Sequence, residues 1–304
     1  MSPVIDDGSA LTYGVVIPVF NRHEYLEEAL SSVRAQTLPP DQIVLVDDGS
    51  SREETVEFLD RIDQGGGISL VRIENRGPGG AFNAGRAELG TDAMLFLADD
   101  DLIAPEYADE AMSVLAGDRS VGVVYCNAVL FGDEQGERPW LLPPYDPRTI
   151  VLDNMVHAAA VVRLRDYDAV GGYDQSLRSG REDHDLWLRM TAARVGFHRL
   201  DKPMFRYRQT PGSVNRQFGT SIERMAETYG RISRNSPDLY LQNMDVLWAE
   251  IFRLRTVVRR YDRLYGRFDN AASRTRRRLR SVLSRARRRG RRGSRGGASG
   301  DAAP

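Results

Sequence analysis

The distribution of apolar residues along positions 14–131 predicts strands separated by helices. Five short apolar runs are rich in β-branched residues, as buried strands are; they are residues 14–20, 42–48, 68–74, 93–99 and 121–131. The segments between them carry apolar residues at helical spacing, and helix-start signals stand at 50–54 and 105–106. Strands that alternate with helices of this length predict an α/β fold with a doubly wound, mostly parallel central sheet.

The pattern loosens after residue 131. Residues 132–149 contain four prolines and are typical of a loop. Extended segments are predicted at 157–163 and 197–209, and an amphipathic helix at 181–195. This half is expected to complete the sheet and to supply a second binding surface.

The C-terminal region has a different repeat. From Tyr240 to Phe268, apolar residues recur at alternating intervals of four and three, as in the seam of a coiled coil. A long helix packed on its own domain would show a similar stripe, so both interpretations stay open. The composition beyond about residue 285 predicts disorder. The predicted parts are an N-terminal tail (1–12), an α/β domain (13–235), a helical extension (236–284) and a basic tail (285–304).

Charge is distributed unevenly, although the whole chain carries a net charge of −1. Residues 251–304 hold 18 arginines, no lysine and three aspartates, a net charge of +15, so the remainder carries −16. The basic end can meet an anionic membrane surface or stay solvated without a partner. The acidic remainder has no recognisable nucleic-acid module, which argues against a nucleic-acid partner.

The sequence also bounds the compartment. A single cysteine, Cys126, excludes an internal disulfide and fits a reducing environment. No signal-peptide pattern is evident at the start, and no window approaches the roughly 20 apolar residues of a membrane span. We expect a cytoplasmic protein, soluble or peripheral at the inner face of the cell membrane.

Two nucleotide-binding fingerprints are missing. The first predicted strand runs into "PVFNR" without G-x-G-x-x-G, and no G-x-x-x-x-G-K-[ST] occurs. The glycine-rich segment "GPGGAFNAG" follows the third strand with a different spacing. These absences argue against a dehydrogenase or a P-loop ATPase.

Acidic residues follow two of the predicted strands, where ligands bind in such sheets. Asp47 and Asp48 can accept hydrogen bonds from a nucleobase or ribose, or simply cap a turn. Asp99, Asp100 and Asp101 form a cluster that capping explains poorly. A hard divalent cation held together with substrate phosphates would account for it.

A third acidic group opens the helix predicted at 181–195. Glu182, Asp183 and Asp185 can favour the helix dipole, or one of them can serve as a general base for a hydroxyl nucleophile. The residues alone leave both interpretations open.

Taken together and in order, seven segments resemble the successive motifs of a family 2 glycosyltransferase with the GT-A fold. The segments are "VVIPVFNR", "VLVDDGSS", "NRGPGGAFNAG", "LFLADDDLIAPEY", "GGYDQSL", "GREDHDLWLRM" and "YRQTPGSV". The resemblance covers residues 13–215. It implies a GT-A domain at 13–235, and an inverting hexosyltransferase that moves a sugar from a nucleotide-diphosphate sugar to a hydroxyl acceptor.

The resemblance also implies roles for individual residues. Donor contacts would come from the first loop, the "DDGS" turn, the glycine-rich segment and the variant D-x-D motif; these are Pro18, Val19, Asn21, Asp47, Asp48, Gly79, Gly80, Asn83 and Asp99. Asp100 would hold Mg²⁺ or Mn²⁺ on the diphosphate. Asp183 would be the catalytic base, with Glu182 supporting it.

The sequence also offers candidate acceptor contacts, and three of its positions depart from the family pattern. Trp140, His157 and His184 are candidate acceptor contacts, and each also suits a structural role. Three positions depart from the pattern: Ala98 replaces a frequent first aspartate, Phe82 a common arginine, and Thr210 a frequent histidine. The resemblance therefore identifies no third protein ligand for the metal.

Without a Q-x-x-R-W motif or membrane spans, we expect non-processive addition of one sugar, in synthesis of a cell-envelope or surface polysaccharide or glycoconjugate. The acceptor would be a hydroxyl compound, such as a lipid-linked one. The heptad helix predicts a homo-oligomer as a further partner. Two alternatives remain, an inactive oligomerising scaffold with the same fold and a nucleotidyltransferase.

Overall fold

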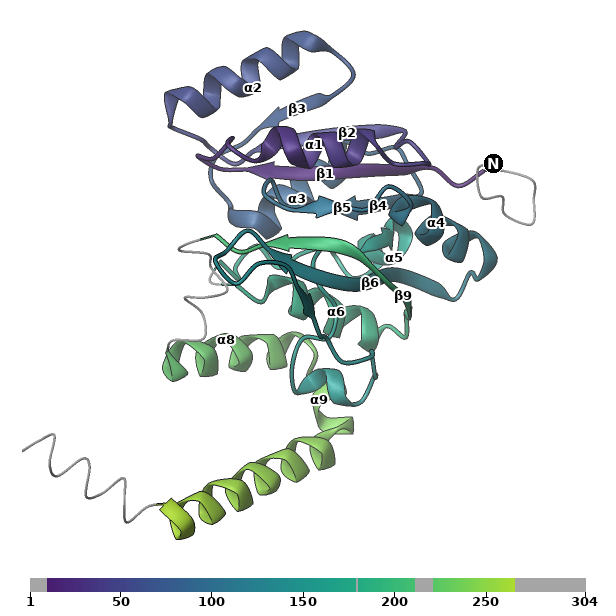
Figure 1. Ribbon diagram of the computed structural model, residues 1–304. Helices are drawn as coiled ribbons and strands as arrows, with labels where there is room; N and C mark the ends of the chain where they lie inside the picture. Colours follow the sequence, from purple (N-terminus) through teal and green to yellow (C-terminus); the bar gives the residue numbers. More distant parts are fainter. Residues whose placement is uncertain (1–9, 179, 211–220, 266–304) are drawn as a thin grey trace, which may run out of the picture. The chain divides into compact units, whose positions relative to one another are not determined.

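The computed structural model describes residues 10–178, 180–210 and 221–265. These residues fall into two units, divided between Met244 and Asp245. In the first half of the first unit, strands and helices alternate as predicted (Figure 1). The elements are β1 (Tyr13–Val19), α1 (Leu26–Arg34), β2 (Gln42–Asp47), α2 (Glu53–Gly65), β3 (Ser69–Arg72), α3 (Gly77–Glu88), β4 (Ala93–Phe96), β5 (Leu102–Ile103) and α4 (Tyr107–Gly117).

The second half adds long strands and the helix that carries the third acidic group. Its elements are β6 (Val121–Phe131), β7 (Arg138–Trp140), the 3-10 helix η1 (Thr149–Val151), β8 (Val161–Arg163), α5 (Leu164–Ala169), α6 (Glu182–Ala192), β9 (Gly196–Arg208), α8 (Ile222–Asn235) and α9 (Pro237–Gln242). The sequence pattern missed β5 and β7, which are too short to show a period.

All strands join one sheet in the order β3-β2-β1-β4-β8-β6-β9-β5, with β7 paired to β6. Strands β1 to β4 are mutually parallel, and so are β6 and β9. Strand β8 runs antiparallel to both of its neighbours and joins the two halves. The predicted mostly parallel α/β sheet is confirmed, with an antiparallel strand at its centre.

Close packing of α3 on the sheet brings the glycine-rich segment to the ends of β1 and β2. A Cβ atom on Gly85 would lie 2.3 Å from a methyl group of Val16, so only glycine permits this approach. The completely buried residues Val15, Ile17 and Leu45 form the core beneath these strand ends. The loops that follow β1, β2 and β4 are therefore held on a rigid edge.

Helices α8 and α9 belong to the first unit. Asn235, at the end of α8, donates a hydrogen bond to Asp185 of α6 at 2.8 Å (Nδ2–Oδ1). Asp185 also forms an ion pair with Arg189 at 2.8 Å, so this fully buried carboxylate serves packing. The predicted limit between domains at residue 235 stays a prediction.

In the second unit, the described residues are helical. Every residue from 251 to 265 is exposed, including the apolar residues of the predicted seam. Tyr240 and Met244 of the seam fall in the first unit, and Phe268 and the basic tail lie outside the described residues. No helix among the described residues is long and apolar enough to cross a membrane.

Candidate functional site

A cavity of about 630 Å³ lies over the carboxyl ends of β1, β2 and β4. Segments before α6 and at the end of β9 close its other side. Seven of the predicted site residues line it: Pro18, Val19, Asp48, Asp99, Asp100, Glu182 and Asp183. The structure thus brings together residues that are up to 165 positions apart in the sequence.

The two aspartates after β2 have different environments. Asp48 lines the cavity and accepts hydrogen bonds from the backbone N–H groups of Arg76 (2.6 Å) and Gly77 (2.9 Å) at the start of α3. Burial raises the pKa of Asp48, and these two hydrogen bonds oppose the rise. Asp47 instead accepts from the backbone of Ser50 at 2.8 Å and lies 3.6 Å from Arg72. It caps the turn and is not among the cavity's lining residues, so its predicted donor contact receives no support.

Asn21 organises the first loop. Its side-chain oxygen accepts hydrogen bonds from the backbone N–H groups of Ser51 (2.7 Å) and Arg52 (2.9 Å), which directly precede α2. Its φ angle of 51° is left-handed, a conformation that asparagine tolerates better than most residues. Asn21 therefore joins two loops beside the cavity and is not among the residues that line it.

The glycine-rich helix start also serves packing. The Asn83 side chain donates a hydrogen bond to the Tyr173 carbonyl oxygen and accepts one from the Tyr173 backbone N–H group, at 2.9 Å in each case. A Cβ atom on Gly79 would lie 3.1 Å from the Tyr173 Cβ atom, and one on Gly80 would collide with Arg76. Gly79 and Asn83 thus hold α3 to the segment before α6, Gly80 leaves room for the Arg76 side chain at the start of α3, and Phe82 lines the cavity and stacks on Tyr173.

Arginines counter the charges of the aspartate cluster after β4. Arg22 contacts Asp99 and reaches Asp100 at 2.9 Å (Nη1–Oδ2). Burial raises the pKa of Asp99 to about 6, while the guanidinium of Arg22 opposes the rise. Asp101 accepts a hydrogen bond from the backbone of Arg208 at 2.8 Å. In the part of the chain that the structure describes, no three His, Cys, Asp or Glu residues are grouped to hold a metal ion.

Helix α6 begins at the far wall of the cavity. The preceding residue, Arg181, has a left-handed φ of 72°, a strained conformation for an arginine. Asp183 Oδ2 accepts a hydrogen bond from Asn154 Nδ2 at 2.8 Å, and its Oδ1 accepts from the His184 backbone at 2.8 Å. Both oxygens of this carboxylate are therefore oriented by neighbours.

The two carboxylates at this helix start influence one another. Burial, reinforced by the charge of Asp183, raises the pKa of Glu182 to about 7. Glu182 Oε2 is buried and has no hydrogen-bond partner among the described residues. Burial also raises the pKa of Asp183, and the positive charge of Arg181 opposes this rise.

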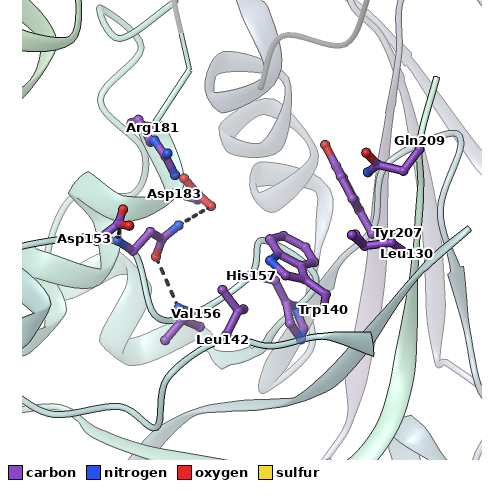
Figure 2. A pocket seen from close by; sticks show the side chains of 11 residues that line it. Leu130, Trp140, Leu142, Asp153, Val156, His157, Arg181, Asp183, Tyr207 and Gln209 are labelled. Atoms are coloured by element: carbon purple, nitrogen blue, oxygen red, sulfur yellow. Dashed lines mark hydrogen bonds between the residues drawn. The ribbon is translucent and has the colours of Figure 1, made fainter. Parts of the chain in front are cut away.

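A second cavity, of about 320 Å³, lies on the other side of Asp183. It is lined by Leu130, Trp140, Leu142, Asp153, Asn154, Val156, His157, Arg181, Asp183, Tyr207 and Gln209. Figure 2 shows Arg181 and Asp183 across this cavity from Tyr207 and Gln209. Arg181, Asp183 and Tyr207 line both cavities, so the two spaces meet at the candidate base.

Two of the three predicted acceptor contacts lie in the second cavity. The Trp140 ring packs on Tyr207 with centroids 5.0 Å apart. His157 is buried, with Nε2 3.0 Å from the Cys126 carbonyl oxygen and no partner for Nδ1 among the described residues. Burial lowers the pKa of His157 to about 4, so its ring is neutral.

His184 does not fit the prediction of an acceptor contact. It is completely buried, and its Nε2 atom lies 2.7 Å from the Ile150 carbonyl oxygen. One helix position separates it from Asp183, which turns its side chain about 100° away from the cavity.

Sequence reasoning missed several lining residues. Arg22 and Arg178 line the first cavity, Asn154 lines the second, and Arg181 and Tyr207 line both. The arginines before "ED" were visible in "LRSGRED" as basic residues beside acids. Nothing in the local pattern marked Asn154, which stands 29 positions before Asp183.

The chain is similar in sequence to known glycosyltransferases. A model described as Glycosyl transferase family 2 matches residues 14–168. The amylovoran biosynthesis glycosyltransferase AmsE of Erwinia amylovora is 28% identical over 215 residues, covering 68% of this chain and 80% of AmsE. An uncharacterized glycosyltransferase of Rickettsia typhi is 27% identical over 187 residues, covering 58% of this chain. The chain spans 57% of that relative and 30% of one from Rickettsia bellii.

Two solved structures with similar folds are complexes with nucleotide sugars. Residues 1–349 of S. aureus TarS, in complex with UDP-GlcNAc, superpose with a TM-score of 0.60 at 19% identity, covering 74% of this chain and 66% of TarS 1–349. The mannosyltransferase PcManGT of Pyrobaculum calidifontis, in complex with GDP-Man and Mn²⁺, gives 0.57 at 17% identity, covering 79% and 71%. At these identities the likeness establishes the fold, which is GT-A.

Proposed function

Because the chain belongs to glycosyl transferase family 2, we propose that it transfers a sugar from a nucleotide-diphosphate sugar to a hydroxyl group, with inversion at the anomeric carbon. The observation that carries this proposal is the meeting of two cavities at Asp183. A donor in the first cavity and an acceptor in the second would place this carboxylate beside the reacting hydroxyl.

The first cavity suits a nucleotide diphosphate. Asp48 keeps lone pairs for a base or ribose N–H or O–H group, and Pro18 and Val19 provide an apolar wall. Arg22 and Arg178 line the same cavity and can neutralise phosphate charge. Two structural neighbours, TarS and PcManGT, form complexes with UDP-GlcNAc and GDP-Man, which supports the same donor class here.

The aspartate pair fits a divalent cation shared with the donor. Mg²⁺ and Mn²⁺ sites of this kind need only one or two carboxylates, since phosphate oxygens supply other ligands. Asp100 would hold the ion and Asp99 the ribose, and Arg22 would yield part of its contact with them. When bound, the ion would withdraw charge from the departing diphosphate. PcManGT binds Mn²⁺ together with its donor.

Asp183 would act as the general base. As the acceptor oxygen bonds to the anomeric carbon, the bond from that carbon to the diphosphate oxygen breaks and the hydroxyl proton passes to Asp183. The hydrogen bond from Asn154 and the charge of Arg181 favour the ionised form that this step requires. Glu182, whose raised pKa leaves it partly protonated near neutral pH, would limit the negative charge beside the base.

The second cavity would receive the acceptor. Trp140 offers an aromatic face to the acceptor. AmsE is named for amylovoran biosynthesis, which supports a role in cell-envelope or surface polysaccharide synthesis. We further propose a cytoplasmic location, peripheral at the membrane through the basic tail, and non-processive addition.

A thermal-shift screen tests the donor class first. UDP, GDP, dTDP and CMP are added with and without Mn²⁺ to the wild type and to Asp100→Ala. We expect one nucleotide diphosphate to raise Tm in a manner that needs both Mn²⁺ and Asp100. Absence of any shift would instead favour an inactive scaffold with this fold. Stabilisation by CMP alone, without metal, would argue against a diphosphate donor.

A further inference from the structure

The helix of the second unit presents an uncovered apolar stripe. Ile251 is 38% exposed, Leu254 49%, Val258 57% and Tyr261 49%. An isolated helix of this length is marginal in water, and most helices gain their stability from packing of the apolar face. A stripe of this kind therefore needs a partner.

The residue types along the stripe select that partner. Positions recur at intervals of four and three; one series holds β-branched Ile251 and Val258, and the other holds Leu247 and Leu254. β-branched residues at the first core position of a heptad with leucine at the second favour two parallel strands. We propose that residues 245–265 pair with the same helix of a second copy as a parallel two-stranded coiled coil.

Flanking charges agree with this arrangement. In a parallel pair, the residue before one core position faces the residue five places later on the partner, which sets Glu250 opposite Arg255. Both copies would gain this ion pair, whereas an antiparallel pair would lose it. Glu250 is now paired with Arg253 on its own helix at 2.6 Å. That ion pair contributes little to stability because it is solvated, so Glu250 can give it up to pair with Arg255 of the partner copy at little cost.

Solution mass and cross-linking test the dimer in the full-length chain. Light scattering after gel filtration should give a dimer for the wild type and a monomer for Ile251→Asp/Leu254→Asp, with the Tm of the first unit unchanged. Thr256→Asp, on the opposite face, is the control and should remain dimeric. Val258→Cys should form an intermolecular disulfide and Arg259→Cys should not; the only native cysteine, Cys126, is buried.

A monomeric wild type at micromolar concentration overturns the proposal. So does a monomer that instead floats with phosphatidylglycerol vesicles through the same stripe, because the stripe would then serve a lipid surface. Equal cross-linking of the two cysteine variants would exclude the parallel register.

A second, independent observation concerns Asn154. Its amide donates to Asp183 at 2.8 Å, and its own oxygen accepts from the Val156 backbone at 3.2 Å. The Val156 carbonyl in turn accepts from Trp187 of α6 at 3.0 Å. His184 of α6 lies 2.7 Å from the Ile150 carbonyl oxygen, so the segment that carries Asn154 is fastened to α6 on both sides of the contact.

We infer that Asn154 is a positioning residue that holds the Asp183 carboxylate ionised and aimed at the junction of the two cavities. This inference rests on the proposed role of Asp183 as base. The other charged or titratable groups that interact with Asp183 are Arg181, Glu182, His184, Tyr173 and Tyr229. Among the described side chains, the uncharged group that donates a hydrogen bond to the Asp183 carboxylate is the Asn154 amide.

The pH dependence of donor hydrolysis separates positioning from mere packing. The probe is whichever of UDP-GlcNAc or GDP-mannose binds, with water as acceptor. Loss of the amide in Asn154→Ala should move the acidic limb of the rate profile to higher pH, and Asn154→Asp should move it further. Asn235→Ala removes a comparable bond to Asp185 and should lower Tm without moving the limb.

The outcomes also separate this inference from the proposed function. Full hydrolysis by Asp183→Asn would refute the base itself. Loss of hydrolysis in Asp183→Asn, together with an unmoved limb in Asn154→Ala, would refute only the positioning role.

Discussion

The aspartates after β4 and the acids that open α6 face the same cavity, yet their surroundings differ. Arg22 counters Asp99 and Asp100 directly, whereas Asp183 is held by an amide and a backbone N–H group. Arg22 opposes the rise that burial causes in the pKa of Asp99, and Arg181 and Asn154 oppose the corresponding rise for Asp183. Both sites thus favour an ionised carboxylate, and they differ in the groups that contact it: an arginine side chain for Asp99 and Asp100, and an amide and a backbone N–H group for Asp183. These different surroundings would suit the two carboxylate sites to the two proposed tasks.

The largest effect is expected when the candidate base is removed, which tests whether the two acidic groups have different roles. Asp183→Asn keeps the size of the side chain and should lower transfer or donor hydrolysis by about 100-fold or more, as loss of a general base does. Nucleotide binding, measured by the Tm shift, should persist. Retained turnover would show that both acidic groups serve the donor.

Removing the Arg22 guanidinium tests the aspartates that follow β4. Arg22→Ala leaves two buried carboxylates unpaired and should cost about 1–3 kcal/mol of unfolding free energy, measured by urea titration. Mn²⁺ with the preferred nucleotide should restore more of this loss than the nucleotide alone. If Mn²⁺ restores nothing, the aspartate pair is no cation site.

The raised pKa of Glu182 predicts a pH-dependent stability. Its folded-state pKa of about 7 exceeds the unfolded value, so the stabilisation associated with its proton is full at low pH and is lost as pH rises toward 7. Tm of the wild type should therefore fall between about pH 5 and 7 relative to Glu182→Gln. Parallel curves for the two proteins would contradict the assignment.

The smallest effect is expected in the turn after β2. Asp48→Asn should weaken nucleotide binding about tenfold, the value of one charge-assisted hydrogen bond. Asp47→Asn should leave affinity unchanged, because that side chain caps the turn. Isothermal titration of both variants compares the neighbours directly, and an equal loss would restore Asp47 as a donor contact.

Periodicity predicted the order of the longer strands and of the helices between them in the first half of the chain, because burial of one face dictates the spacing of apolar residues. It missed short elements such as β5 and β7. It was weaker at the strand ends, where alternation stops. There it offered no way to tell Asp47 from Asp48, or to see that Asn21 and Asn83 use their amides on the backbone. Tertiary contacts such as Asn154 with Asp183 leave no local pattern at all.

The two cavities share only Arg181, Asp183 and Tyr207 among the lining residues described, and most other residues of the second cavity come from positions 130–157. Such a division makes the molecule modular. With the acceptor in the second cavity, as proposed, substitutions in residues 130–157 would alter the choice of acceptor while the strand ends of the proposed donor cavity stay unchanged. New linkages could then evolve, or be engineered, without rebuilding the half of the molecule proposed to recognise the activated sugar.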